Sequence, residues 1–220
     1  MNILFLNSKL KVLIRRLVGN LAFSSKNYWE KRYKGMGTSG AGSYGRLAQF
    51  KSEVINNFIL EHDVHTVLEF GCGDGNQLLL ANYPSYRGVD VSRTAIELCR
   101  NKFSSDLKKQ FCLLSDYKLV LADLTLSLDV IYHLVEDRIY LEHMHYLFDS
   151  SNKYVIIYSS NHDDLNYDGT HERHRNLTRW VEQYRRDFKL TNIIKNRYPF
   201  SDKNPNDTSH ADFYFFERAT

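Results

Sequence analysis

The stretch VLEFGCGDG, residues 67–75, decides the fold of this chain. Its first four residues are mostly apolar, which predicts a short buried strand, and glycines follow at positions 71, 73 and 75. Glycine lets the backbone turn sharply and lets a ligand approach the main chain closely. The stretch therefore predicts a strand that ends in a nucleotide-binding turn, with a helix beyond it.

The spacing around this turn narrows the kind of ligand. The dinucleotide fingerprint G-x-G-x-x-G needs its third glycine one residue later, where this chain has Asn76. Glu69 precedes Gly71 by two residues, and Asp90 follows that glycine by 19. A carboxylate at the end of the second strand can accept hydrogen bonds from ribose hydroxyls, so Asp90 is a candidate ribose ligand. The alternative for Asp90 is a helix N-terminal charge beside Ser92.

Apolar strand patterns alternate with helical patterns along most of the chain. We expect strands at 66–70, 86–91, 110–114, 124–128, 154–159, 190–197 and 212–218. We expect helices at 47–60, from 76 to 82, from an N-cap at Ser92 to about 103, near 137–148 and at 177–188. The uninterrupted apolar runs favour a buried parallel sheet. The last two strands are joined only by the polar segment 202–210, so they predict an antiparallel pair.

Composition limits the function classes. The chain has 220 residues, 25% of them charged and 43% hydrophobic, which is typical of one soluble domain with its own core. A formal net charge of +3 is too weak to indicate a nucleic-acid partner. Cys72, Cys99 and Cys112 show no CxxC pairing, which favours a reduced, cytoplasmic compartment.

The N-terminal 46 residues differ from the rest. Residues 1–23 carry leucines and Ile14 at helical spacing, interrupted by four basic residues, and predict an amphipathic helix. This helix either covers the protein's own core or contacts a partner or the surface of the inner membrane. Residues 34–45 hold five of the 11 glycines and predict a loop. We therefore divide a single domain, 1–220, into an N-terminal helix and glycine-rich lid, 1–46, and a ligand-binding core, 47–220.

Residues 67–75 together with Asp90 resemble the cofactor motifs of class I S-adenosylmethionine (SAM)-dependent methyltransferases. This resemblance implies an α/β, Rossmann-like seven-stranded sheet, mostly parallel, with a C-terminal antiparallel strand pair and helices on both faces. It also implies SAM as the cofactor. The core residues expected to bind SAM are Glu69, Gly71, Cys72, Gly73, Gly75, Asp90 and Val91, with Asp116 and Tyr117 as looser matches after the third strand.

A narrower resemblance covers residues 28–33 and 39–47. These segments are similar to small methyltransferases encoded beside glycosyltransferases in surface-polysaccharide loci. The resemblance implies that an N-terminal lid closes over SAM. Tyr44 and Arg46 are then expected to cap the cofactor, with Arg46 meeting its carboxylate. The alternative is a solvated glycine loop.

The segment after the fourth strand is the candidate catalytic side. Residues 127–137 contain no proline, whereas methyltransferases of nucleobase amino groups carry a proline-rich turn there. His133 is the first choice for a general base or substrate-orienting group, because imidazole accepts a proton near neutral pH. Asp129 is expected to orient SAM or assist the base, and Tyr132 to contact the substrate or simply pack. His162, after the fifth strand, is the alternative base.

The next loop offers a candidate substrate rim. His171, Arg173, His174 and Arg175 are expected to hold an anionic group of the acceptor, although a solvated loop is the alternative. His171-Glu172-Arg173-His174 is not H-E-x-x-H, which excludes the zinc-protease pattern. We expect no metal, and the alternative is a magnesium site formed by Asp163 and Asp164 with a histidine.

These observations predict a cytoplasmic O-methyltransferase acting on a sugar, a glycan precursor or a related small molecule of surface-polysaccharide biosynthesis. One rival is a Rossmann oxidoreductase that uses NAD(P). The other is a catalytically silent SAM-fold subunit that docks to a glycosyltransferase or a membrane through residues 1–23.

Overall fold

The computed structural model describes residues 23–164, 167 and 171–219. The amphipathic helix predicted for residues 1–23 therefore lies almost wholly outside the described residues. Among the helices of the described ranges, none is long and apolar enough to cross a membrane.

Seven strands form one sheet, as predicted. Their order is β3-β2-β1-β4-β5-β7-β6, and β1 to β5 pair in parallel. The last strand pairs antiparallel with both β5 and β6, so it alone runs against the others. The strand bounds are β1 Val67–Phe70, β2 Tyr86–Asp90, β3 Lys109–Leu113, β4 Ala122–Leu128, β5 Ser151–Ser159, β6 Phe188–Ile194 and β7 Asp212–Arg218.

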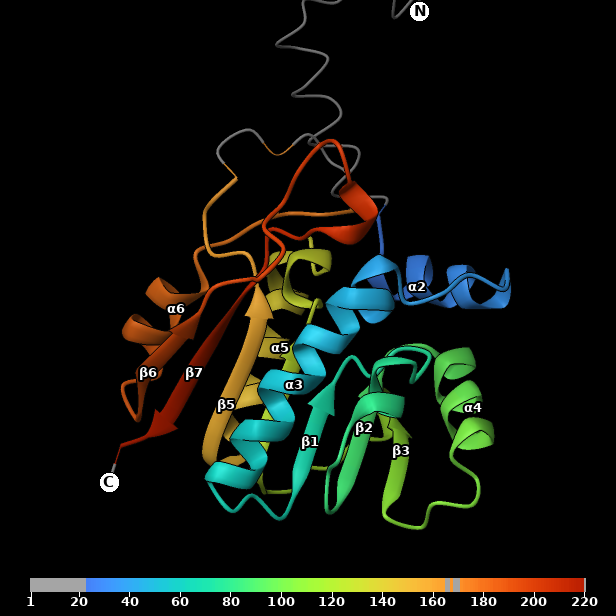
Figure 1. Ribbon diagram of the computed structural model, residues 1–220, viewed down its shortest axis with the longest axis horizontal. Coiled ribbons are helices and arrows are strands. Elements are labelled where there is room, and N and C mark those ends of the chain that lie inside the picture. Colours follow the sequence, from blue (N-terminus) through green and yellow to red (C-terminus); the bar gives the residue numbers. More distant parts are fainter. Residues whose placement is uncertain (1–22, 165–166, 168–170, 220) are drawn as a thin grey trace, which may run out of the picture.

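Helices cover both faces of the sheet (Figure 1). Side chains of a strand point alternately to its two faces. Val67 accordingly packs with α3 (Gly45–Glu61) and α4 (Arg93–Lys102), whereas Leu68 packs with α5 (Asp137–Asp149) and α6 (Leu177–Tyr184). The predicted N-cap is confirmed, since the hydroxyl of Ser92 accepts a hydrogen bond from the backbone N–H of Ala95.

Two predicted helices are wrong in extent. The helix expected from residue 76 is only a single 3₁₀ turn, Gln77–Leu80. The side-chain amide of Asn56 on α3 donates to the carbonyl of Leu80 and accepts from the N–H of Asn82, so these backbone groups bond to α3 and not to a further helical turn. The helix at 177–188 ends at Tyr184, because Phe188 is buried in the core as the first residue of β6.

The N-terminal helix of the described chain, α2 (Ser25–Lys34), lies above the carboxyl ends of β1 and β2 (Figure 1). The carboxylate of Glu30 accepts hydrogen bonds from the hydroxyls of Ser92 and Thr94 at the start of α4. At its other end, the backbone N–H and hydroxyl of Ser25 donate to Glu136, which precedes α5. This helix therefore bridges two core helices and closes the edge of the sheet where parallel folds bind ligands.

Candidate active site

A cavity of about 510 Å³ lies at the carboxyl edge of the sheet, beneath α2. It is lined by residues from the turn after β1, the end of β2, the start of the β4–α5 connection and α2 itself. Eight of the residues predicted from sequence line it: Glu69, Gly71, Cys72, Gly73, Asp90, Val91, Asp129 and His133. The structure therefore brings together the carboxylates and glycines that the sequence pattern singled out.

Glu69 and Asp90 are the two buried carboxylates of this cavity. Glu69 accepts a hydrogen bond of 2.6 Å from the hydroxyl of Tyr86, and Asp90 accepts one from the backbone N–H of Gly73 and one from that of Ser92. Burial raises the pKa of Glu69 to about 7, although the Tyr86 hydrogen bond and the charge of Lys51 oppose the rise. Burial likewise raises the pKa of Asp90 to about 6, against its backbone donors.

The glycine turn leaves no room for a side chain at its first glycine. Gly71 has a φ of 89°, and a Cβ there would lie 2.4 Å from Cγ2 of Val130. Gly75, also predicted to bind the cofactor, lies outside the cavity lining. A Cβ at Gly75 would press on Phe103 and Cys99, so this glycine serves the packing of the turn against α4.

The segment between α2 and α3 packs directly on this turn. The backbone N–H of Ser39 and the hydroxyl of Tyr44 both donate to Asp74 Oδ2, at 2.8 and 2.9 Å. The hydroxyl of Ser39 in turn accepts a hydrogen bond from the N–H of Asp74. Tyr44 thus fastens the predicted lid to the glycine turn but does not line the cavity.

Three further residues predicted to bind the cofactor lie outside the lining of this cavity. Arg46 donates to the backbone carbonyl of Asp207 and stacks over the ring of Tyr198, away from the cavity. Asp116 is exposed in a 3₁₀ turn after β3. Tyr117 packs against Phe70 with its hydroxyl beside Ser150. The loop after β3 contributes Leu114 to the cavity instead.

Lys51 on α3 is a cavity residue that the sequence interpretation missed. Its side chain is 1% exposed, and its Nζ lies 2.6 Å from Oδ2 of Asp129. A signal existed, because Lys51 lies one turn after Leu47 and one turn before Ile55, in the middle of the buried stripe of α3. A lysine in such a stripe is rarely buried without a charged partner.

Gln77 is a second missed residue, and no sequence signal marks it. Its side-chain N–H donates to the backbone carbonyl of Ala48. Within the described ranges, Gln77 Oε1 is one of three buried side-chain atoms without a hydrogen-bond partner, and it alone belongs to a residue that lines this cavity. An orphaned buried acceptor is costly, and a donor on a ligand in this cavity would satisfy it.

A second cavity, of about 340 Å³, adjoins the first. The two cavities share four lining residues, Trp29, Ser39, Asp129 and His133, which we call the shared wall. Of the predicted catalytic and substrate residues, Tyr132, His171 and His174 line this second cavity together with the shared wall. The hydroxyl of Tyr132 donates to Oδ1 of Asp129, which ties the two sides together.

His133 is held at the shared wall by aromatic neighbours. The ring of Trp29 meets it edge-on at 5.0 Å, and the ring of Tyr132 lies at 4.5 Å. Burial lowers the pKa of His133 to about 4, despite the opposing charge of Glu172. The imidazole is therefore neutral at physiological pH and a weaker base than an ordinary histidine. Its Nδ1 lies 3.4 Å from the carbonyl oxygen of His171, which leaves Nε2 as the ring nitrogen that can accept a hydrogen bond.

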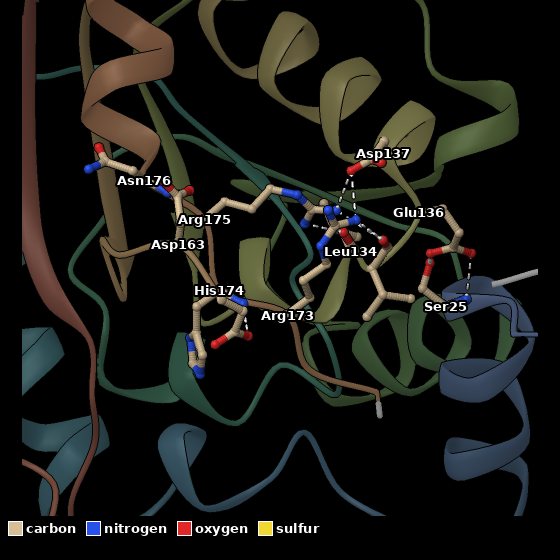
Figure 2. Close-up of polar contacts among 11 residues, drawn as sticks. Ser25, Leu134, Glu136, Asp137, Asp163, Arg173, His174, Arg175 and Asn176 are labelled. Carbon is tan, nitrogen blue, oxygen red and sulfur yellow. Dashed lines mark hydrogen bonds and ion pairs between the residues drawn. The ribbon is translucent and has the colours of Figure 1, made fainter. Parts of the chain in front are cut away.

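Arg173 and Arg175, predicted as substrate ligands, lie outside the linings of both cavities. Figure 2 shows both guanidinium groups converging on Asp137 at the start of α5. Arg175 also donates to the backbone carbonyls of Leu134 and Val135. The two arginines therefore anchor residues 171–176 beside the β4–α5 connection. His162, the alternative base, lies outside both linings and stacks on His174 at 4.6 Å.

No protein-family model and no curated protein matches the sequence. Solved structures match its fold. Magnesium protoporphyrin IX methyltransferase (ChlM) from Synechocystis PCC 6803 with bound SAM aligns with a TM-score of 0.65 at 14% identity, over 90% of this chain and 99% of that one. The N-methyltransferase NodS from Bradyrhizobium japonicum WM9, in complex with S-adenosyl-L-homocysteine (SAH), aligns with a TM-score of 0.58 at 14% identity, over 79% and 88%.

The methyltransferase domain of bacterial CtHen1-C aligns with a TM-score of 0.59 at 18% identity, over 77% of this chain and 97% of that one. The chain therefore has the Rossmann-like fold of class I SAM-dependent methyltransferases.

Proposed function

We propose that the chain is a SAM-dependent methyltransferase that methylates an oxygen of a sugar, a glycan precursor or a related small molecule of surface-polysaccharide biosynthesis. The observation that carries the proposal is the pair of buried carboxylates, Glu69 and Asp90, on the wall of one cavity in this fold. Two buried acids beside a glycine turn suit a ligand that carries positive charge and ribose hydroxyls, as SAM does.

The donors and acceptors of the larger cavity fit SAM. A carboxylate has about four lone-pair sites, and the backbone N–H groups of Gly73 and Ser92 use two of those on Asp90, which leaves sites for ribose hydroxyls. Glu69 and the orphaned Oε1 of Gln77 are the acceptors for an ammonium group. Lys51 replaces Arg46 as the residue that would meet the carboxylate of the methionine part.

In this proposal the larger cavity binds SAM and the smaller cavity binds the acceptor, since the two cavities meet at the shared wall. SAM, when bound in the larger cavity, supplies a methyl group that is already activated by its sulfonium. What the protein contributes is alignment of an acceptor and exclusion of water. An acceptor in the smaller cavity would meet the methyl group at the shared wall, where His133 presents a neutral imidazole to a hydroxyl.

The lining of the smaller cavity supports a ring-shaped polar acceptor. Tyr28, Trp29 and Phe200 offer aromatic surfaces, and His171, His174 and His210 offer polar edges. The aromatic rings can pack against the apolar face of such a ring, and the polar groups between them can form hydrogen bonds with its hydroxyls. The link to surface polysaccharides rests on the resemblance of residues 28–33 and 39–47, and a cytoplasmic location, with a peripheral place at the inner membrane through residues 1–23, belongs to the same proposal.

The proposal is tested by incubating the purified chain with SAM and a panel of sugar nucleotides and glycan fragments, followed by mass spectrometry. We expect one acceptor class to gain a CH₂ unit, with SAH formed in equal amount. His133→Ala should lower turnover while SAH binding survives. Consumption of NAD(P)H or NAD(P)⁺ with the same panel, and no methylated product, would overturn the proposal.

A further inference from the structure

Two histidines and one glutamate meet on the wall of the smaller cavity. His133, His171 and Glu172 each offer a donor atom, and these atoms all lie within 4.8 Å of one another. Nε2 of His171 lies 3.5 Å from Oε1 of Glu172, and Nδ1 of His133 lies 4.0 Å from the same oxygen. Nδ1 of His133 also lies 3.4 Å from the backbone carbonyl oxygen of His171, a contact that a bound ion would replace. Two ligand atoms bound at about 2.1 Å to one tetrahedral ion lie roughly 3.4 Å apart. The separations are therefore close to those of ligands around a single ion.

The chain holds these three residues from several sides. The ring of Tyr28 stacks on His171 at 5.0 Å, and the edge of Trp29 contacts His133. Beyond Glu172, the backbone N–H of Arg173 donates to the carbonyl of Tyr132 at 2.7 Å, next to His133. The guanidinium of Arg173 forms an ion pair with Asp137, as Figure 2 shows. Such surrounding contacts orient metal ligands before an ion arrives.

We propose that the His133–His171–Glu172 cluster binds a divalent transition metal ion, with zinc as the best-suited probe. Two imidazoles and one carboxylate favour zinc and its neighbours, whereas magnesium and calcium prefer oxygen ligands throughout. Three protein ligands leave at least one coordination position open, and the cluster borders the smaller cavity.

This metal site rests on the proposed function and extends it, because the position of the ion indicates which class of acceptor the chain would methylate. His133 belongs to the shared wall, so an ion on its Nδ1 side lies beside the place where acceptor and cofactor cavities meet. A bound metal ion lowers the pKa of a coordinated hydroxyl and fixes its position. The acceptor class that this site would select is therefore a hydroxyl compound, and with the ion bound His133 would hold the ion in place of presenting a free imidazole to that hydroxyl.

No sequence pattern predicts this site, because His133 and His171 are 38 residues apart and match no metal-ligand spacing. The two segments become neighbours only because the arginine anchors on Asp137 hold 171–176 against the start of α5.

The test is a zinc titration of the full chain, freed of metal with a chelator and of any purification tag. We expect one zinc ion per chain by competition with a chromophoric chelator. His171→Ala and Glu172→Gln should each weaken binding by at least about tenfold. His162→Ala is the matched control, since His162, Asp164 and His174 form a second group whose donor atoms lie within 4.8 Å of one another. In that group Nδ1 of His174 is already hydrogen-bonded to the hydroxyl of Ser160 at 2.6 Å, so we expect no zinc there. His162→Ala should leave the zinc affinity unchanged.

Thermal unfolding and SAH binding of the same variants separate loss of a ligand from loss of the fold. Side chains of His171 and Glu172 are 43% and 45% exposed, so their replacement should not unfold the chain. Absence of stoichiometric zinc binding, or a loss in His162→Ala that His171→Ala does not share, would overturn the metal site. Zinc binding without SAH binding would support the metal site and remove the proposed function.

Discussion

Lys51 and Asp129 form a buried ion pair where the larger cavity meets the shared wall, with Nζ 2.6 Å from Oδ2. Asp129 has a φ of 59°, in the left-handed region that residues other than glycine seldom adopt. The hydroxyl of Tyr132 donates to the other carboxylate oxygen at 2.8 Å. Two polar contacts thus hold a strained residue at the junction of the two cavities, as strained residues at functional sites commonly require.

Replacement of Lys51 by methionine should destabilise the chain strongly. The substitution keeps the volume of the side chain but leaves the largely buried carboxylate of Asp129 without its cation. Breaking a buried pair costs about 3–5 kcal/mol, which urea denaturation measures directly. Lys34→Met removes a matched but exposed pair with Glu30 and should cost less than about 1 kcal/mol. Equal losses in the two variants would show that the Lys51–Asp129 pair carries no special weight.

Asp90 and Asp116 should behave differently, although both were predicted from sequence to bind the cofactor. Asp90 lines the larger cavity, whereas Asp116 is exposed and outside it. Asp90→Asn should weaken SAH binding by more than about tenfold, because the loss of one charged hydrogen-bond acceptor costs about 1.5–3 kcal/mol. Asp116→Asn should bind SAH normally. Isothermal titration of both variants decides, and a loss confined to Asp116→Asn would contradict the cavity assignment.

The affinity for SAH should rise with pH between 6 and 8. Burial raises the pKa of Glu69 from 4.5 to about 7, so below that pH the unliganded site holds a proton that an ammonium-bearing ligand must displace. We expect SAH to bind about tenfold tighter at pH 8 than at pH 6, with the step absent in Glu69→Gln. Titrations across this range, with proton release followed in two buffers, measure the effect. A flat profile in the native chain would contradict it.

The same two carboxyl groups should make the unliganded chain less stable as the pH rises. The pKa values of Glu69 and Asp90 in the folded chain, about 7 and about 6, lie above their ordinary values. The folded state therefore binds more protons, and this contribution to stability is present below about pH 4 and is lost as the pH rises to about 7. Urea midpoints at pH 5 and 8 measure it. Replacement of both residues by their amides should remove this part of the pH dependence.

Asp137 should control the position of the segment 171–176. Asp137 forms ion pairs with both Arg173 and Arg175, so Asp137→Ala releases both guanidinium groups at once. We expect faster amide hydrogen exchange in 171–176 and weaker zinc binding, with SAH binding retained. Arg179→Ala, which removes only the exposed pair with Asp163, is the control. Unchanged exchange in Asp137→Ala would show that the arginine anchors do not hold the segment.

The strand pattern could be predicted from sequence because it depends on local features. Apolar runs, the glycines after β1 and the N-cap Ser92 specify their own segments, and each is present in the structure. Glu69 and Asp90 could be placed for the same reason, since the carboxyl ends of adjacent parallel strands meet at one edge. The helix predicted after the glycine turn is wrong in extent because Asn56, a distant residue on α3, binds the backbone groups of Leu80 and Asn82.

The rest of the site depends on contacts between distant segments, which no local pattern contains. Arg46 and Arg175 have suitable charges for binding an anion. In the folded chain, however, Arg46 donates to the backbone carbonyl of Asp207, and Arg175 forms an ion pair with Asp137. Lys51 enters the site only because α3 packs against the sheet with that side chain inward. Charge alone could therefore not separate ligand-binding arginines from structural ones, because their partners lie far away in sequence.

The most direct measurement is titration of the purified chain with SAH and, separately, with NADH, followed by calorimetry and thermal unfolding. We predict saturable binding of one SAH per chain. SAH at about 100 times its Kd should stabilise the fold by ~2.7 kcal/mol. That corresponds to a rise in Tm of roughly 5–10 °C for a domain of this size. At the same SAH concentration Asp90→Asn should cut the rise to about half or less, and NADH should not produce it. Stabilisation by NADH, with none by SAH, would contradict the assignment of this cavity to SAM.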